Sequence, residues 1–253
     1  MTNINIKMLN YIKYLSLCVI FLNITFSNSQ NYENQINITP ISHATFILEY
    51  EKQVIYIDPV GGKDAFIGQK KPSLIIITDI HGDHFDNNTL LELESEGIKK
   101  VMPKAVFDKL DSTLNKNIIV LNNSESHKLN SKISIEAIPM YNLREEALKF
   151  HPKGRGNGYI LTLGKKRVYI SGDTEDIVEM RSLQNIDIAF VCMNLPYTMT
   201  VKSASEAVLE FKPKHVYPYH YRGKNGFSDV SLFKTIIEES NKSIEVIQLD
   251  WYK

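Results

Sequence analysis

The chain has 253 residues, of which 43% are hydrophobic and 23% charged, so it is long enough to bury a substantial core. Lysine plus arginine and aspartate plus glutamate both number 29, and this balance leaves no net charge to attract nucleic acid or an anionic membrane as a bulk partner. We therefore expect one large domain rather than two small ones, and no nucleic-acid partner.

The N-terminal segment differs from the rest of the chain. Lys7 and Lys13 precede an apolar run over residues 14–22, and small polar residues follow at 27–30. This order is typical of a secretory signal peptide, and the run is too short for a comfortable membrane span. We predict a signal peptide over residues 1–30 and a single secreted or periplasmic domain over residues 31–253, with no stable membrane insertion after cleavage. An uncleaved N-terminal anchor is the alternative.

The first elements of the mature chain are two predicted strands, over residues 42–50 and 53–57. His43 lies at the start of the first strand, where a histidine is more often a hydrogen-bonded structural residue than a metal ligand. The second strand ends at Asp58, whose conformation is restricted by Pro59. From the residues alone, Asp58 is a turn former.

The next predicted strand, residues 74–77, is a short β-branched run typical of a buried position. Directly after it, the pattern D-x-H-x-D-H places four potential metal ligands within six positions: Asp79, His81, Asp83 and His84. Imidazoles and carboxylates bind divalent cations at about 2.0–2.2 Å, and a tight loop can point alternate side chains into one cavity. Because α/β folds place their chemistry at strand ends, we expect a metal site here rather than a polar turn with incidental histidines.

The middle of the chain alternates predicted helices and strands. Helices are expected over residues 88–94, with Asn87 or Asn88 as the N-cap, and over residues 103–114. Strands are expected over residues 100–102, 118–121 and 132–138, the last two in a second sheet.

A polar, glycine-rich loop follows the last of these strands. Asn142 lies at the strand end. His151 lies nine residues beyond it, and the residues alone leave open whether His151 binds metal, binds substrate or is incidental. Three cations of this loop suit an anionic substrate such as a phosphate, although a charge run is usually a solvated face: Lys149, Lys153 and Arg155.

The C-terminal half repeats the pattern of a strand followed by polar residues. A predicted hairpin, residues 159–163 and 166–170, leads to Asp173, which is either presented at the strand end or the N-cap of a following helix. A buried strand over 187–191 leads to Tyr197, a candidate substrate contact, and to a helix over 203–211. The strand over 215–218 leads to His220, and a helix over 231–240 and an edge strand over 244–247 follow.

Taken in order, these motifs resemble those of the metallo-β-lactamase-fold hydrolases. The stretch from Asp79 to His84 is similar to the H-x-H-x-D-H signature, with Asp79 where the first histidine usually stands, and residues 171–174 and 217–220 match later motifs. The resemblance extends from about Ile41 to the C-terminus, and it is closest to the subgroup that contains ascorbate-6-phosphate lactonase. It implies an α/β (α+β) fold: a four-layer αββα sandwich of two mixed β-sheets flanked by helices.

The resemblance also implies roles for individual residues. In that family an Asp-Pro pair equivalent to Asp58 and Pro59 closes a hairpin beneath the active site, so Asp58 either belongs to such a hairpin or is a turn former only. The first metal site would use Asp79, His81 and Asp173, and either Asn142 or His151 would complete it. The second would use Asp83, His84, Asp173 and His220. Asp173 would therefore bridge the two sites, and Asp83 and His84 would also be catalytic. The candidate substrate contacts are His43, Asn142, His151 and Tyr197. His43, which lines the cleft in that family, would either contact substrate or support a metal ligand, and it is not expected to bind metal itself.

The implied function is a metal-dependent hydrolase in which a metal-bound hydroxide cleaves a small ester, lactone or phosphodiester. Zinc is the default cofactor, with one or two ions bound. Aspartate in place of the first histidine adds a hard ligand, so manganese and iron(II) stay as options. The partner is a small-molecule substrate. The alternative is a catalytically degenerate member of the fold that binds metal or ligand without turnover.

Overall fold

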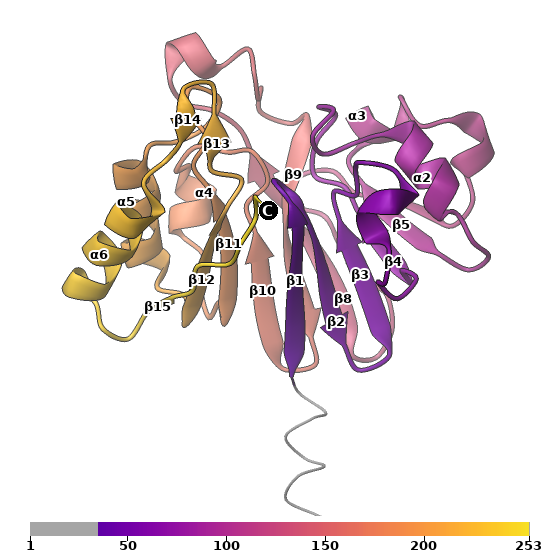
Figure 1. Cartoon of the computed structure of the whole chain (residues 1–253), viewed down its shortest axis with the longest axis horizontal. Helices are drawn as coiled ribbons and strands as arrows, with labels where there is room; N and C mark the ends of the chain where they lie inside the picture. The colour runs from indigo at the N-terminus through magenta and orange to yellow at the C-terminus, as the bar shows by residue number, and fades with distance from the viewer. Residues whose placement is uncertain (1–34, 253) are drawn as a thin grey trace, which may run out of the picture.

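Two β-sheets face each other and helices cover their outer faces in the computed structural model, which describes residues 35–252 (Figure 1). The first sheet has the strand order β1 (Ile36–Ser42), β2 (Thr45–Tyr50), β3 (Gln53–Ile57), β4 (Leu74–Ile76), β5 (Lys99–Met102) and β6 (Ile118–Val120). The second has the order β15 (Glu245–Val246), β12 (His215–Tyr219), β11 (Ile188–Cys192), β10 (Lys166–Ile170), β9 (Gly156–Leu163), β8 (Ile133–Met140) and β7 (Ser126–Lys128). The four-layer sandwich expected from the sequence is confirmed.

The helices fall into two groups, one on each side of the sandwich (Figure 1). The first sheet is covered by α2 (Asn87–Leu93) and α3 (Lys104–Phe107), and the second by α4 (Val178–Arg181), α5 (Val201–Phe211) and α6 (Val230–Ser240). Short 3-10 helices are η1 (Lys63–Phe66), η2 (Ser112–Leu114) and η3 (Glu145–Ala147), and a small hairpin is formed by β13 (Arg222–Gly223) and β14 (Gly226–Phe227). Side chains that accept backbone N–H groups cap the longer helices: Asp86 for α2, Thr200 for α5 and Asp229 for α6.

Both sheets are mixed, and each joins an antiparallel part to a parallel part. In the first sheet, β1, β2 and β3 are antiparallel neighbours, whereas β3, β4, β5 and β6 are parallel. In the second sheet, β7 to β10 are antiparallel, whereas β10, β11, β12 and β15 are parallel. Parallel strands of one sheet end at the same edge. The loops that follow β3 and β4 in the first sheet therefore begin close together, as do those that follow β10, β11 and β12 in the second.

Alternation along the strands explains the two apolar layers that hold the sandwich together. On β3, Ile55 and Ile57 pack in the cluster between the sheets, whereas Val54 and Tyr56 pack in the cluster beneath α2 and α3. The run over residues 74–77 is apolar throughout because side chains on both faces of β4 are buried.

Four predictions differ from the structure. Residues 118–121 were expected in the second sheet, but β6 is the edge strand of the first, parallel to β5. The helix expected over 103–114 is divided into α3 and η2, and the N-cap of α2 is Asp86 rather than Asn87 or Asn88. Residues 42–50 are not one strand, because β1 ends at Ser42 and His43 forms a turn with φ 55°.

The predicted signal peptide over residues 1–30 lies outside the described part of the chain. Within residues 35–252, no helix is both long enough and apolar enough to cross a bilayer.

Candidate metal centre

Histidines and aspartates from separate segments meet at one edge of the sandwich. They follow the ends of β4, β10 and β12, occupy the β1–β2 turn, and lie in the loop between β8 and β9. Within the described residues, three groups, two of which share His220, each offer ligand atoms that lie within 4.8 Å of one another: His43, Asp83 and His220; Asp79, His81 and His151; and His84, Asp173 and His220. The motifs that are far apart in the sequence therefore share one place in the fold.

The residues predicted for the second metal site lie together. The Nε2 atoms of His84 and His220 are 3.0 Å apart. Asp173 is close to both, with Oδ2 3.5 Å from His84 Nε2 and Oδ1 3.3 Å from His220 Nε2. The Oδ2 atom of Asp83 is also 3.3 Å from His220 Nε2. Two imidazoles and two carboxylates thus surround a common point.

The residues predicted for the first site form a neighbouring group that includes His151. Oδ2 of Asp79 is 2.7 Å from His81 Nδ1 and 3.9 Å from His151 Nε2. His151 Nε2 is 3.2 Å from Asp173 Oδ2, so Asp173 contacts both groups. It does not cap a helix, because α4 begins at Val178 with Ile177 as its N-cap.

A buried carboxylate fixes the orientation of His84. Asp58, which follows β3, is fully buried and its Oδ2 lies 2.8 Å from His84 Nδ1. The other oxygen of Asp58 accepts the backbone N–H of Thr78, and the Thr78 hydroxyl donates to Oδ2. Because Asp58 accepts the Nδ1 proton, Nε2 is the His84 atom that can exchange a proton for a metal ion. A carboxylate behind a histidine is the usual support of a metal ligand.

A backbone carbonyl fixes the orientation of His151 in the same way. His151 Nδ1 is 3.1 Å from the carbonyl oxygen of Tyr197. The side-chain amide of Asn142 donates to the carbonyl oxygens of Ala147 and Tyr197, so both of its N–H groups are used. His151 Nδ1 is therefore the donor to Tyr197, and its Nε2 faces Asp173. Asn142 lies behind His151, on the side away from the carboxylates.

Charge interactions within the cluster shift the pKa of its members strongly. Burial opposes the charged form of His84, but Asp173 and Asp58 outweigh it and hold the pKa of His84 well above its ordinary value. Burial likewise opposes the ionised form of Asp173, yet His220, His84 and His151 hold its pKa well below the usual range. The cluster therefore favours ionised carboxylates around positive charge.

The donor set fits a divalent metal ion. Two buried atoms that face the cluster lack a hydrogen-bond partner among the described residues: His151 Nε2 and Asp173 Oδ1. Buried polar atoms without partners are rare in folded proteins. A cation between the Nε2 atoms and the carboxylates would satisfy both atoms at once. With His151 included, each group offers two imidazoles, one carboxylate of its own and the shared Asp173.

Arg155 is part of the centre and not a free cation. Its Nε and Nη2 atoms donate to the two oxygens of Asp79, at 3.1 and 2.9 Å. The bidentate pair holds Asp79, whose side chain is fully buried. Of the other two cations noted in this loop, Lys153 pairs with Glu179, and Lys149 lies over the ring of Phe150.

A pocket of about 340 Å³ opens onto the cluster. Its lining residues are His81, Asp83, Phe150, His151, Asp173, Asn194 and Tyr197. The rings of Phe150 and Tyr197 meet edge to face, with centroids 5.1 Å apart, and form an aromatic wall. Of the four candidate substrate contacts, His151 and Tyr197 line this pocket, whereas Asn142 and His43 are not among the lining residues.

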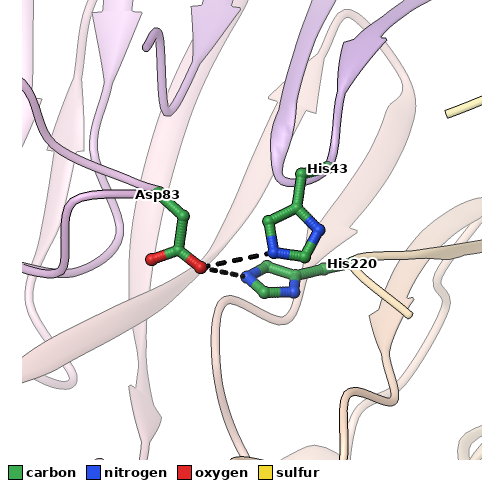
Figure 2. Close-up of side chains that lie close together, drawn as sticks. All are labelled: His43, Asp83 and His220. Carbon is green, nitrogen blue, oxygen red and sulfur yellow. Dashed lines mark ion pairs between the residues drawn. The ribbon is translucent and has the colours of Figure 1, made fainter. Parts of the chain in front are cut away.

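His43 lies beside the cluster, next to Asp83 (Figure 2). Its Nε2 is 3.3 Å from Asp83 Oδ2, the oxygen that is also 3.3 Å from His220 Nε2. Both histidines have left-handed backbone conformations, with φ 55° for His43 and 48° for His220. Residues other than glycine seldom adopt this conformation, and those that do gather at functional sites.

Three residues shape the centre in roles that the sequence did not indicate: Asp58 supports His84, Arg155 pairs with Asp79, and Phe150 forms a wall of the pocket. The signal for Asp58 was its position at the end of a strand next to and parallel with β4, the same rule that located the D-x-H-x-D-H motif. No comparable signal pointed to the other two, because both lie in an irregular loop.

Comparison with known proteins identifies the family. The family described as the beta-lactamase superfamily domain matches residues 37–220. A metal-dependent hydrolase of Pyrococcus furiosus is 27% identical over 222 residues, which cover 83% of this chain and 95% of that protein.

Solved structures agree. A protein from Parabacteroides distasonis, assigned as a metal-dependent hydrolase, is 38% identical with a TM-score of 0.75, covering 84% of this chain and 92% of that one. The metallo-beta-lactamase fold protein YhfI of Bacillus subtilis, 13% identical with a TM-score of 0.68 over 85% of this chain and 96% of that one, shows likeness of fold. The chain therefore belongs to the beta-lactamase superfamily, among its metal-dependent hydrolases.

Proposed function

We propose that the protein is a secreted or periplasmic hydrolase that binds zinc and cleaves a small ester or lactone. In this proposal Asp79, His81, His151 and Asp173 hold one ion, and Asp83, His84, Asp173 and His220 hold a second. The observation that supports it most is the approach of His84 Nε2 and His220 Nε2 to 3.0 Å, with carboxylate oxygens of Asp83 and Asp173 beside them. Such a set is stable only with positive charge at its centre.

The residues around the site have different roles in hydrolysis. A divalent cation, when bound, supplies Lewis-acid activation of water and of the scissile carbonyl oxygen. Asp58 and the Tyr197 carbonyl keep the ligand nitrogens of His84 and His151 directed inward. Asp83 is the most exposed carboxylate of the set, at 41%, and the contact of its Oδ1 with His84 Nε2 is 3.9 Å. Oδ1 is therefore placed to accept a proton from the attacking water.

The pocket lining favours an uncharged substrate. Its volume of about 340 Å³ suits a small molecule, and the walls are the rings of Phe150 and Tyr197 with the amide of Asn194. Among the described residues that line it, none is lysine or arginine. We therefore rank an ester or lactone above a phosphodiester, and an anionic substrate stays a prediction that a substrate panel can test.

Zinc is proposed because each ligand group combines two imidazoles with carboxylates. Histidine and carboxylate ligands suit zinc, and they also suit iron(II) and manganese. Elemental analysis of the purified protein would distinguish these ions, and a dominant content of manganese or iron would overturn the zinc assignment.

The cellular location is proposed from the sequence of residues 1–30. Cleavage after Ser29 or Gln30 would leave β1, which begins at Ile36, intact in the mature protein. N-terminal sequencing of exported protein is expected to show this start, and an intact Met1 in the exported protein would contradict it.

Hydrolysis assays with and without chelator test the function. The panel contains a simple aryl ester, a lactone, a phosphodiester and a β-lactam. We expect chelator-sensitive hydrolysis of the ester or lactone, at least a hundredfold loss in His84→Ala, and no change in His127→Ala, a control on the exposed edge strand β7. Full activity of His84→Ala would contradict the proposal. Bound metal without turnover of any substrate would favour the ligand-binding alternative.

A further inference from the structure

The turn that carries His43 is tied to the C-terminal end of the described chain. The backbone N–H of His43 donates to the carbonyl oxygen of Trp251 at 3.4 Å, and the N–H of His220 donates to the carbonyl oxygen of His43 at 3.3 Å. Trp251 is fully buried. The β1–β2 turn, the end of β12 and residues 251–252 thus form one hydrogen-bonded unit beside the ligand cluster.

The hydroxyl of Tyr252 has its hydrogen bonds fully assigned. It accepts the backbone N–H groups of Tyr221 and Arg222, each at 3.1 Å. It lies 2.7 Å from Nδ1 of His43. A phenol carries one proton. Since both backbone groups are donors, that proton is directed to His43, and Nδ1 of His43 is the acceptor.

The tautomer of His43 follows from this direction. A neutral imidazole carries one N–H, so with Nδ1 as acceptor the proton is on Nε2. Figure 2 shows this edge of the ring turned toward Asp83, and Nε2 lies 3.3 Å from Asp83 Oδ2. His43, Asp83 and His220 are close enough to hold an ion by distance alone. A protonated nitrogen has no lone pair for a metal, however, so the hydrogen bonds argue against His43 as a ligand.

We propose that Tyr252 is a positioning residue: it holds His43 as an Nε2–H donor to Asp83 and so keeps His43 out of the metal ligand set. The effect on metal rests on the proposed function, in which Asp83 is a ligand. A hydrogen bond to a ligand carboxylate orients it and tunes its affinity for metal, commonly by 10- to 100-fold. The C-terminal aromatic residue thereby acts on the centre through two hydrogen bonds without contacting the ion.

Nitrogen-15 NMR of the histidine rings in the full chain tests the proposal. The spectrum distinguishes protonated from unprotonated ring nitrogens, and His43→Gln identifies the signals of His43 among the seven histidines. We expect Nε2–H on His43 both without metal and with saturating zinc. Tyr252→Phe removes the hydroxyl and keeps the ring, and it should abolish this preference. Tyr221→Phe is the matched control, because its ring packs 4.9 Å from that of Tyr252 and no hydrogen bond of its hydroxyl is found among the described residues.

Two results would overturn the proposal: an Nδ1–H tautomer in the wild-type chain, or loss of the Nε2 proton when zinc is added. Retention of the wild-type pattern in Tyr252→Phe would overturn the role of Tyr252. Zinc content adds an independent measure, since His43→Ala should bind as many zinc equivalents as wild type, and the loss of one equivalent would identify His43 as a ligand. A chain that binds no zinc but keeps Nε2–H on His43 would contradict the proposed function and still support the assignment of the hydrogen bonds.

Discussion

The orientation of His84 depends on Asp58, a residue 26 positions earlier in the chain. The carboxylate has no contact with the pocket, yet it selects which imidazole nitrogen faces Asp173 and His220. His151 obtains the same selection from a backbone carbonyl, whereas the phenol of Tyr252 donates to His43 and selects the opposite tautomer, with the proton on Nε2. Three histidines of the centre are thus directed by three different acceptors or donors, each of which leaves Nε2 pointing toward carboxylate oxygen.

The substitution Asp58→Asn tests this support. An amide can still accept from Thr78, but it cannot accept from both Thr78 and His84 as the carboxylate does. We expect the affinity for zinc to fall about 10- to 100-fold, measured by calorimetric titration. Asp64→Asn, an exposed aspartate in η1, is the control and should bind zinc as wild type does. Equal affinities for Asp58→Asn and wild type would show that His84 is oriented by other contacts.

Arg155 gives a second prediction at this scale. Asp79 is fully buried, and without Arg155 its charge would lose the bidentate partner. Breaking a buried pair from one side typically costs about 3 kcal/mol or more. We expect Arg155→Met to lower the free energy of unfolding in chelator by about that amount in urea titrations. Arg167→Met, which removes a half-exposed pair with Glu136, should cost less than about 1 kcal/mol.

The effect of Arg155→Met should depend on pH with a definite sign. Burial opposes the ionised form of Asp79, but His81, His84 and Arg155 together lower its pKa in the folded chain. The stabilisation is therefore present above the ordinary carboxyl range and is lost as the pH falls through the folded pKa. A difference between Arg155→Met and wild type that grew on acidification would contradict this assignment, as would equal costs for the two arginine substitutions.

At the scale of elements, the centre depends on how tightly the strand-end loops approach one another. Gly172, between β10 and Asp173, has φ 59°, and a Cβ there would lie 2.5 Å from Met140 Sδ and 3.2 Å from the carbonyl oxygen of Asn157. A side chain at this position would therefore be strained by the backbone and crowded against β8 and β9, where the loop after β10 passes over them. The next residue is Asp173, the candidate ligand that both groups share.

The substitution Gly172→Ala separates this crowding from backbone strain. A left-handed alanine costs about 1–2 kcal/mol anywhere, and Gly68→Ala supplies that reference because Gly68 has φ 82° with nothing within 4 Å of its added Cβ. We expect Gly172→Ala to lose more stability than Gly68→Ala in thermal unfolding and also to lose zinc, since Asp173 would be displaced. If the two variants had the same stability and zinc content, the close approach would have no functional consequence.

The sequence predicted the strands and loops of this centre better than it predicted which strands pair and which side chains meet. The run over residues 74–77 and the motif after it were located correctly because a strand end and its polar loop are contiguous in the chain. The sequence did not show which sheet a strand joins. The pattern of residues 118–121 is the same whether they pair with β5 or with β8, and only the long-range pairing distinguishes the two. The choice between Asn142 and His151 likewise depends on a loop that folds back over the cluster.

The same limit applies to individual residues. Asp58 read as a turn former, and it does have φ 46°, but its second role depends on Thr78 and His84, which a local pattern cannot place. The sequence predicted Arg155 to be a cation that suits an anionic substrate, because its contact with Asp79 depends on the fold and is not visible in the sequence. His43 and Tyr252 are 209 positions apart, and no periodicity links them.

At the scale of the molecule, the two sheets are joined around one apolar cluster and deliver their loops to one edge. Residues from the first sheet supply Asp58 and the D-x-H-x-D-H motif, and residues from the second supply Asp173 and His220. Neither half contains the ligand set alone, so metal binding and the packing of the sheets are coupled. A bound ion should therefore raise the stability of the whole chain and not of one loop.

The most direct test is a crystal structure of the zinc-loaded protein with anomalous scattering measured at the zinc edge. The account predicts a peak bounded by His84 Nε2, His220 Nε2 and the carboxylates of Asp83 and Asp173, with a second, where two ions bind, among Asp79, His81 and His151. No zinc peak within this cluster, with His84 and His220 still in direct contact, would contradict the account.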